Sequence, residues 1–409
     1  MRKTPSRQNT LKKILIIHTD GNSFNNPSLK CIIDLLLDKG CEIDLRYPKS
    51  PAPMPYHEGI RLLPFGVWVG RWKSRVFNRY CFRPLVFLSV LVEKFVYYNK
   101  YDLIIGVDRQ GLIEAGALNK LTKTPYVYIS FEISFEDETS ARYKSLEKEA
   151  SKNVAAWVVQ DEVRAGHLQR ENRLDPLNKI LLPLASAGAG VAKADRLRDR
   201  LGIADDKKVA IAIGAISKWT MTSQIMQCVA GWPEDWVLVV HDRFGQTREL
   251  LAGELAAFTK LLDRKIFISD AAPEMVDDMG SILAGISVGL AFYKPEYGNG
   301  PFYGKNLEYL GLASGKISTC LRYGVPVIMN KVGLYAEEAV QFRFGCVVEG
   351  PGQIKDRLDE ISHAEYRHNA QDYFVTKLDF NIYRDKIWSR FEALVNDARY
   401  LGNGDIQEL

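Results

Sequence analysis

The sequence predicts an α/β protein made of two doubly wound, Rossmann-like domains that face each other across a cleft. Three observations carry this prediction. Short apolar runs typical of buried parallel strands alternate with segments of helical periodicity. The alternation stops at a small-residue stretch near the middle of the chain and then starts again. The 409 residues, 46% hydrophobic and 25% charged, suffice for two soluble domains of ordinary size.

The first domain is expected to span residues 1–185. Its strands are short apolar runs that end in glycine, proline or polar residues, namely KKILIIH, CEIDLRYP, YDLIIGVD, TPYVYISF, NVAAWVVQ and KILLPL. Segments with helical apolar spacing lie between these runs, namely PSLKCIIDLLLDKG, GLIEAGALNKL and EVRAGHLQREN.

The second domain is expected to span residues 186–409, because ASAGAGVAKAD marks a small-residue join. Its expected strands are KKVAIAIG, DWVLVVHD, KIFISD, ISVGLAFY, VPVIMN and CVVEG, and KISTCLRYG is an expected helix. An amphipathic helix at about residues 380–400 closes the chain, and its apolar face suits packing back on the first domain.

Charge and cysteine usage narrow the class of protein. The first 185 residues hold 28 basic and 20 acidic residues, and the remainder holds 26 and 30. This asymmetry favours an anionic partner for the first domain, although chance alone could produce it. The six cysteines form no CxxC or Cys/His cluster, which excludes a typical zinc site and suits reduced thiols. Neither a signal peptide nor a membrane-spanning apolar run is evident, so we expect a cytoplasmic protein.

One segment, GLASGKISTCLRYGVPVIMN, predicts an anion site. Ser314 and Gly315 form a small-residue turn at the start of a short helix, and Lys316 adds a full positive charge. A helix N-terminus offers unpaired backbone N–H groups and a positive dipole end, which together suit a diphosphate. The alternative is an ordinary loop, helix and strand with a solvated lysine.

The same segment resembles the donor site of GT-B glycosyltransferases, especially the large, mostly retaining bacterial group 1 family. Lys316, Gly324 and the following Pro-Val-Ile match its pattern, and Thr319 stands where a glutamate usually holds the nucleotide ribose. A threonine hydroxyl still offers one hydrogen bond there.

A second segment, VAIAIGAISK, resembles the first strand and glycine loop of that family's donor domain. Gly214 matches, Ala215 replaces the usual arginine, and Ser217 and Lys218 approximate the family's basic position. Within the loop YKPEYGNGPFYGKN, Tyr293 and Asn306 flank a stretch rich in glycine and aromatics, and we assign both to sugar or base contacts. His241, at the end of WVLVVH, is either a nucleotide contact or, in preference, a core histidine.

The resemblance implies an enzyme that moves a sugar from a nucleotide-sugar donor on the second domain to a glycan acceptor on the first. It implies a retaining transfer in bacterial surface polysaccharide biosynthesis. No cofactor and no metal are expected, because the nucleotide sugar is a substrate and the chain holds no DxD motif. The alternatives are a GT-B sugar-nucleotide 2-epimerase and a non-enzymatic two-domain ligand-binding protein. The oligomeric state is left open.

Polar residues at three strand ends of the first domain are expected to face the cleft. Glu132 and Asp20 are the candidate catalytic carboxylates, as a general base or an orienting group for an acceptor hydroxyl. The other candidates on this wall are His18, Gly21, Asp108 and Arg109.

Residues 59–92 contain no acidic residue and mix basic with aromatic side chains. This composition suits reversible binding to an anionic membrane surface, which favours a lipid-linked acceptor. An ordinary helix with a solvated basic face is the alternative, and nucleic acid is not expected because no binding motif accompanies the charge. The residues assigned to the membrane are Arg71, Trp72, Lys73, Arg75 and Arg79.

Overall fold

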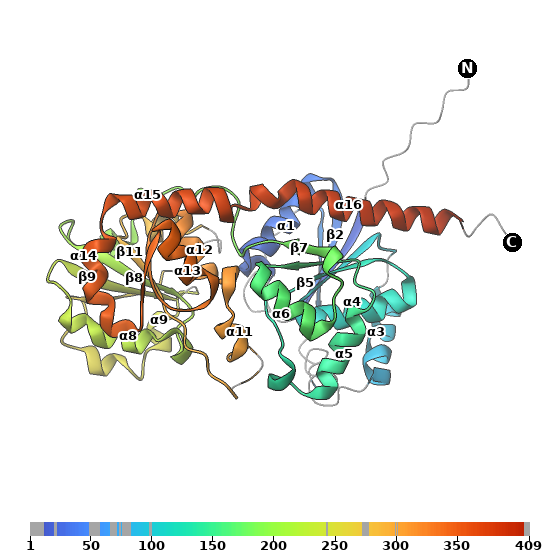
Figure 1. Ribbon diagram of the computed structural model, residues 1–409, viewed down its shortest axis with the longest axis horizontal. Coiled ribbons are helices and arrows are strands. Elements are labelled where there is room, and N and C mark those ends of the chain that lie inside the picture. Colours follow the sequence, from blue (N-terminus) through green and yellow to red (C-terminus); the bar gives the residue numbers. More distant parts are fainter. Residues whose placement is uncertain are drawn as a thin grey trace, which may run out of the picture.

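The computed structural model has two α/β lobes side by side (Figure 1). It describes residues 12–19, 23–48, 58–65, 72, 75, 83–97, 100–242, 244–271, 278–298, 300 and 302–404. Within these residues each lobe holds one sheet in which all strand pairs are parallel. The predicted pair of doubly wound units is therefore confirmed.

The first sheet has the strand order β3-β2-β1-β4-β5-β6-β7 among the described residues. Its strands are β1 Lys12–His18, β2 Cys41–Pro48, β3 Ile60–Phe65, β4 Leu103–Val107, β5 Tyr126–Ile129, β6 Ala156–Val159 and β7 Lys179–Leu181. Its helices are α1 Pro27–Asp38, α3 Arg83–Tyr97, α4 Asp108–Thr122, α5 Ala141–Ser151 and α6 Glu162–Asn172.

Both faces of this sheet are buried because successive side chains of each strand point to opposite faces. In β1, Ile14 and Ile16 pack in one core cluster with α1, whereas Leu15 and Ile17 pack in another with α4, α5 and α6. The continuous apolar runs of the sequence follow from this two-sided burial.

The second sheet has the order β10-β9-β8-β11-β12-β13 among the described residues. Its strands are β8 Lys208–Gly214, β9 Trp236–Asp242, β10 Ile266–Ser269, β11 Val288–Ala291, β12 Val327–Asn330 and β13 Gly345–Val348. Its helices are α7 Leu197–Arg200, α8 Thr222–Cys228, α9 Thr247–Leu250, α10 Gly280–Leu283, α11 Lys305–Glu308, α12 Gly315–Arg322, α13 Gly333–Phe342, α14 Leu358–Ile361 and α15 Ala364–Tyr373.

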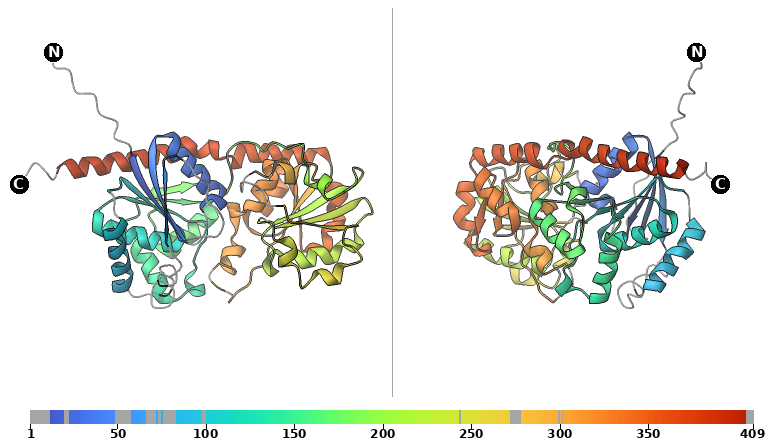
Figure 2. Two further views of the ribbon diagram at one scale, coloured as in Figure 1. Left: turned by 180° about the vertical axis from the view of Figure 1, so that it is seen from behind. Right: turned by 45° about the vertical axis from the view of Figure 1, so that its right-hand side comes forward.

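The last helix, α16 Phe380–Gly404, runs from the second lobe along the first, as all three views show (Figures 1 and 2). Its apolar residues join the core cluster that contains α1, namely Phe380, Ile387, Phe391 and Val395. The chain passes between the lobes near Ser186 and again near Phe380, and these two segments are hydrogen-bonded to each other. The Phe380 N–H donates to the Ser186 carbonyl, and the Gly188 N–H donates to the Asp379 carboxylate. No helix among the described residues is long and apolar enough to cross a membrane.

The edge strand β3 is a feature that the sequence analysis missed. The prediction placed its residues at the start of the basic, aromatic segment. In the structure Ile60–Phe65 pairs in parallel with β2, and the Arg61 Nε donates to the Asp44 Oδ1 over 2.8 Å. Arg61 is therefore held within the sheet edge, and the segment's positive charge begins after it.

Candidate functional site

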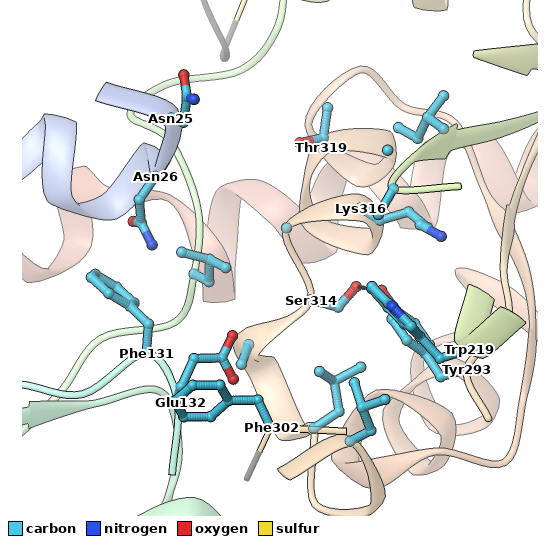
Figure 3. A pocket seen from close by; sticks show the side chains of 18 of the residues that line it. Asn25, Asn26, Phe131, Glu132, Trp219, Tyr293, Phe302, Ser314, Lys316 and Thr319 are labelled. Carbon is cyan, nitrogen blue, oxygen red and sulfur yellow. Dashed lines mark hydrogen bonds between the residues drawn. The ribbon is translucent and has the colours of Figure 1, made fainter. Parts of the chain in front are cut away.

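A cleft of about 800 Å³ lies between the two sheets, within the size range of small-molecule sites. It opens at the carboxyl ends of the central strands, where the strand order reverses and doubly wound folds bind ligands. In the first sheet this point lies between β1 and β4, and in the second between β8 and β11. Figure 3 shows side chains from both lobes facing this space.

The wall from the second lobe is built on the N-terminus of α12. Ser314 is the N-cap and accepts a hydrogen bond from the Ile317 N–H over 3.2 Å. Gly214, at the end of β8, has a φ of +94°, and a Cβ there would lie 3.6 Å from the Lys316 Cε. The glycine loop and the lysine therefore meet, although 102 positions separate them in the sequence.

One aromatic ring lies beside Lys316, and a second ring stacks on the first. The Lys316 Nζ lies 5.2 Å from the ring centroid of Tyr293, and the Tyr293 hydroxyl hydrogen-bonds to Ser314. The Trp219 ring stacks on the Tyr293 ring, with the two centroids 6.1 Å apart and an interplanar angle of 21°. Lys316, Thr319, Ser314, Tyr293 and Trp219 lie on the same side of the cleft (Figure 3).

Most of the predicted donor residues line this cleft, namely Gly214, Tyr293, Asn306, Ser314, Gly315, Lys316 and Thr319. Ser217 and Lys218 are not among the lining residues. Lys218 borders a separate, polar pocket together with Ser223 and Glu254. Trp219, the next residue along the chain, does line the cleft, as do Ala215 and Ile216 just before this turn.

On the first lobe, His18 and Asp108 line the cleft at the strand-order reversal. The His18 Nδ1 lies 3.0 Å from the Ser23 Oγ, and burial lowers the pKa of His18 to about 4. Asp108 begins α4 with a φ of +53°, and its Oδ1 accepts hydrogen bonds from the backbone N–H groups of Phe131 and Glu132. Asp108 thus fixes the loop that carries Glu132.

Glu132 lines the cleft and is tied to the second lobe. Its Oε2 accepts a hydrogen bond from the Asn306 Nδ2. Burial raises the pKa of Glu132 above its ordinary value, and the nearby Arg164 guanidinium and the Asn306 amide act in the opposite direction. Asn306 also accepts from the Ile133 N–H over 2.9 Å and from Arg164 over 3.2 Å. Its amide is thus occupied by contacts between the lobes.

Arg164 is fully buried and joins the lobes. From α6 it donates to the backbone carbonyls of Phe131 and Tyr309 and to the side chain of Gln160, each over 2.7 to 2.9 Å. The neighbouring Asp161 accepts from the Leu312 N–H over 2.8 Å. The segment that follows α11 is therefore held by the first lobe.

Arg109 is not among the residues that line the cleft. Its guanidinium lies 4.3 Å from the ring centroid of Tyr143 and 4.8 Å from that of Phe302, a residue of the second lobe. The prediction that Arg109 faces the cleft is not supported by this position, because the side chain bridges two aromatic rings instead.

Five predicted residues lie outside the described part of the chain, namely Asp20, Gly21, Arg71, Lys73 and Arg79. Trp72 and Arg75 are described and exposed. Among the described residues no group of three or more His, Cys, Asp or Glu side chains is placed to hold a metal ion.

Several lining residues escaped the sequence analysis, namely Asn25, Asn26, Trp219 and Phe302. Asn26 carried a local signal, because it precedes Pro27 at the start of α1 and its side chain accepts from the Leu29 N–H. Trp219 and Phe302 carried none, because their role depends on contacts distant in the sequence.

Comparison with known proteins identifies the fold. No protein-family model matches the chain, and no curated protein sequence matches it. HepE from Anabaena, crystallised with UDP and glucose, is 14% identical over 93% of this chain and 99% of its own, with a TM-score of 0.68. Sucrose-phosphate synthase from Thermosynechococcus elongatus is 14% identical over 94% and 100%, with a TM-score of 0.69.

WaaG, a glycosyltransferase involved in lipopolysaccharide biosynthesis, is 14% identical over 92% of this chain and 98% of its own, with a TM-score of 0.61. These likenesses span nearly the whole of each chain. The chain therefore has the GT-B fold, in which two Rossmann-like domains flank a cleft, and the predicted fold class is confirmed.

Proposed function

We propose that this protein is a glycosyltransferase that takes its sugar from a nucleotide-sugar donor. One observation carries the proposal: Gly214, Lys316 and the N-terminus of α12 converge at one side of the cleft, opposite Glu132. A structure with the same fold, HepE, was crystallised with UDP and with UDP-glucose, which supports a nucleotide sugar as the donor.

The cleft wall from the second lobe, called the second wall below, would bind the diphosphate. Lys316 supplies a cation, and the first backbone N–H groups of α12 supply donors and a positive dipole end. Glycosyl transfer creates negative charge on the departing diphosphate, so these groups would stabilise the transition state without a metal ion. Thr319, one turn further along α12, also lines the cleft and would hydrogen-bond to a ribose hydroxyl.

Glu132 would act as the general base that accepts the proton of the acceptor hydroxyl. In the proposed retaining transfer, the bond between the anomeric carbon and the diphosphate breaks, and the acceptor oxygen bonds to that carbon from the face that the diphosphate leaves. The electron pair leaves with the diphosphate, and the acceptor proton passes to the Glu132 carboxylate. Burial, which raises the pKa of this carboxyl, makes it a better proton acceptor than an exposed glutamate.

The acceptor is proposed to be a lipid-linked glycan at an anionic, cytoplasmic membrane surface, as in bacterial surface polysaccharide biosynthesis. The basic, aromatic composition of residues 66–92 supports this, as do three exposed apolar side chains there: Trp72 (43%), Phe87 (38%) and Leu88 (48%). Each basic residue near such a surface contributes about 1 kcal/mol.

Vesicle co-sedimentation tests the membrane part. The protein should pellet with anionic vesicles at ~0.1 M salt and be released at ~1 M, because the Debye length falls from ~10 Å to ~3 Å. The combined change Arg71→Gln, Lys73→Gln, Arg75→Gln and Arg79→Gln should abolish pelleting and leave nucleotide binding intact. Wild-type protein that ignores anionic vesicles at low salt would remove the support for a lipid-linked acceptor.

A thermal-shift screen against UDP, GDP, ADP, CMP and dTDP tests the donor part. A ligand that binds only the folded state, at ~100 times its Kd, stabilises that state by about 2.7 kcal/mol. The corresponding nucleotide sugar should then release its diphosphate only with an acceptor, and NMR of the anomeric proton should show the proposed retention. Release of a free epimerised nucleotide sugar without an acceptor would instead indicate an epimerase.

A further inference from the structure

His241 lies at the carboxyl end of β9, and one of its two ring nitrogens has no hydrogen-bond partner. Its side chain lines the cleft, but it exposes essentially no surface to water. The Nδ1 lies 2.9 Å from the Ser269 Oγ on the neighbouring strand β10, with which His241 is in register. The Nε2 is buried and makes no hydrogen bond. Because an unpaired buried donor or acceptor is costly, such an atom calls for a partner.

The contact with Ser269 allows the imidazole tautomer that carries its proton on Nε2. The Ser269 hydroxyl has one hydrogen to donate, and it already accepts a hydrogen bond from the Ala271 N–H over 3.4 Å. The His241 Nδ1 is its acceptor when the imidazole carries its proton on Nε2. Burial lowers the pKa of His241 to about 4, so the ring is neutral near pH 7 and, in this tautomer, presents a single N–H at Nε2.

The strand order places this N–H beside the proposed diphosphate site. His241 pairs with Ile213 on β8, and the next pair joins Asp242 to Gly214, the residue adjacent to Lys316. If the diphosphate of a nucleotide lies between Gly214 and α12, its base can lie next to it, at the carboxyl ends of β9 and β10. Phe244, 56% exposed, also lines the cleft at this side and offers an aromatic face.

We propose that His241, oriented by Ser269, selects the nucleobase by donating its Nε2–H to a ring carbonyl oxygen. The inference rests on the proposed function, because it takes the cleft ligand to be a nucleoside diphosphate. It commits the ligand to a base with a carbonyl group, such as uracil, thymine or guanine. Adenine has no carbonyl oxygen and leaves the N–H without that partner.

The test is calorimetric titration of UDP, dTDP, GDP and ADP into the wild-type protein and its variants, with ribose 5-diphosphate as a probe without a base. ADP should bind most weakly of the four nucleotides. His241→Leu should weaken the tightest carbonyl-bearing nucleotide roughly 5- to 150-fold, the effect of one lost buried hydrogen bond. Its affinity for ribose 5-diphosphate should not change.

His241→Gln restores an N–H donor on a side chain of similar reach and should recover most of the lost affinity. Ser269→Ala should cause a smaller loss that again requires the base. His167→Leu is the matched control, because it removes a histidine with a hydrogen-bond partner, Arg170, that does not line the cleft, and nucleotide affinity should not change.

The outcomes separate the two proposals. If the wild-type protein binds none of the nucleotides, the proposed function fails and this inference fails with it. If nucleotides bind but ADP binds most tightly, or His241→Leu leaves affinity unchanged, the inference alone is wrong and His241 is a core residue. Equal losses of nucleotide and ribose 5-diphosphate in the leucine variant also overturn it, because they indicate a distorted diphosphate site. If His241→Leu does not fold, the glutamine and Ser269→Ala variants decide the question.

Discussion

The two walls of the cleft use their polar groups in opposite ways. On the second lobe, Lys316 and the first N–H groups of α12 line the cleft. On the first lobe, Asp108 fixes a loop, and Glu132 is bound to Asn306 from the opposite lobe. The wall from the second lobe thus presents positive charge to the cleft, whereas the wall from the first lobe holds one carboxylate in place.

Removing the carboxylate should have the largest effect on activity. Glu132→Gln keeps the shape of the side chain and should lower kcat roughly 10²- to 10⁴-fold, the usual contribution of a general base. Nucleotide affinity should stay constant, because the diphosphate contacts lie on the other wall. Steady-state kinetics and calorimetry together check this, and a variant with wild-type kcat would remove Glu132 from the chemistry.

The pH profile sharpens the same prediction. Burial raises the pKa of Glu132 above its ordinary value of 4.5, so the carboxylate is protonated as the pH falls through that raised pKa. Protonated Glu132 cannot accept the hydroxyl proton, and kcat should therefore fall toward acid with a limb above pH 4.5. The limb should be absent from the residual activity of Glu132→Gln.

The junction of the two walls depends on Arg164. Arg164→Met removes a fully buried guanidinium and leaves Glu132 and Asp161 without their cation. Breaking such a buried pair costs about 3–5 kcal/mol of unfolding free energy. Urea unfolding measures it, with Arg196→Met as control, because the pair of Arg196 with Asp199 is exposed and water screens it. Equal losses in the two variants would contradict the role assigned to Arg164.

A smaller effect separates helix capping from ligand binding. Ser314 and Ser140 are N-caps of α12 and α5, and each accepts a backbone N–H over 3.2 Å. Ser314→Ala and Ser140→Ala should each cost about 1 kcal/mol of stability. Only Ser314→Ala should also weaken diphosphate binding, because of these two helices it is α12 that begins at the cleft. Loss of diphosphate affinity in both variants would indicate a general effect of destabilisation.

The smallest expected effect concerns metal ions. Lys316 and the α12 N-terminus are proposed to balance the diphosphate charge, so EDTA should leave the transfer rate unchanged. Complete loss in EDTA, with recovery on adding Mn²⁺ or Mg²⁺, would contradict the metal-independent mechanism.

The contrast between the walls also explains what the sequence could predict. Ser314, Gly315 and Lys316 are consecutive, so the start of α12 could be predicted from its turn, its charge and the strand that follows. Contacts that join distant segments could not be predicted. An example is the hydrogen bond between Arg164 and Asn306, which are 142 positions apart in the sequence.

Two further misses have the same origin. Lys218 was predicted to bind the donor because it approximates the family's basic position, but Lys218 borders a separate pocket and Trp219 lines the cleft instead. Strand β3 was missed because its Arg61 counted toward a basic segment, and only its partner Asp44 on the adjacent strand reveals the sheet edge.

The central claim is that the second wall binds the donor diphosphate and the first does not. Calorimetric titration of the best-binding nucleoside diphosphate, and of its nucleoside, into wild type, Lys316→Ala and Glu132→Gln tests it most directly. Lys316→Ala should lose about 1.5–3 kcal/mol for the diphosphate and nothing for the nucleoside, the value of one charged hydrogen bond. Glu132→Gln should bind both as the wild type does. Unchanged diphosphate affinity in Lys316→Ala, or an equal loss in Glu132→Gln, would contradict the division between the two walls.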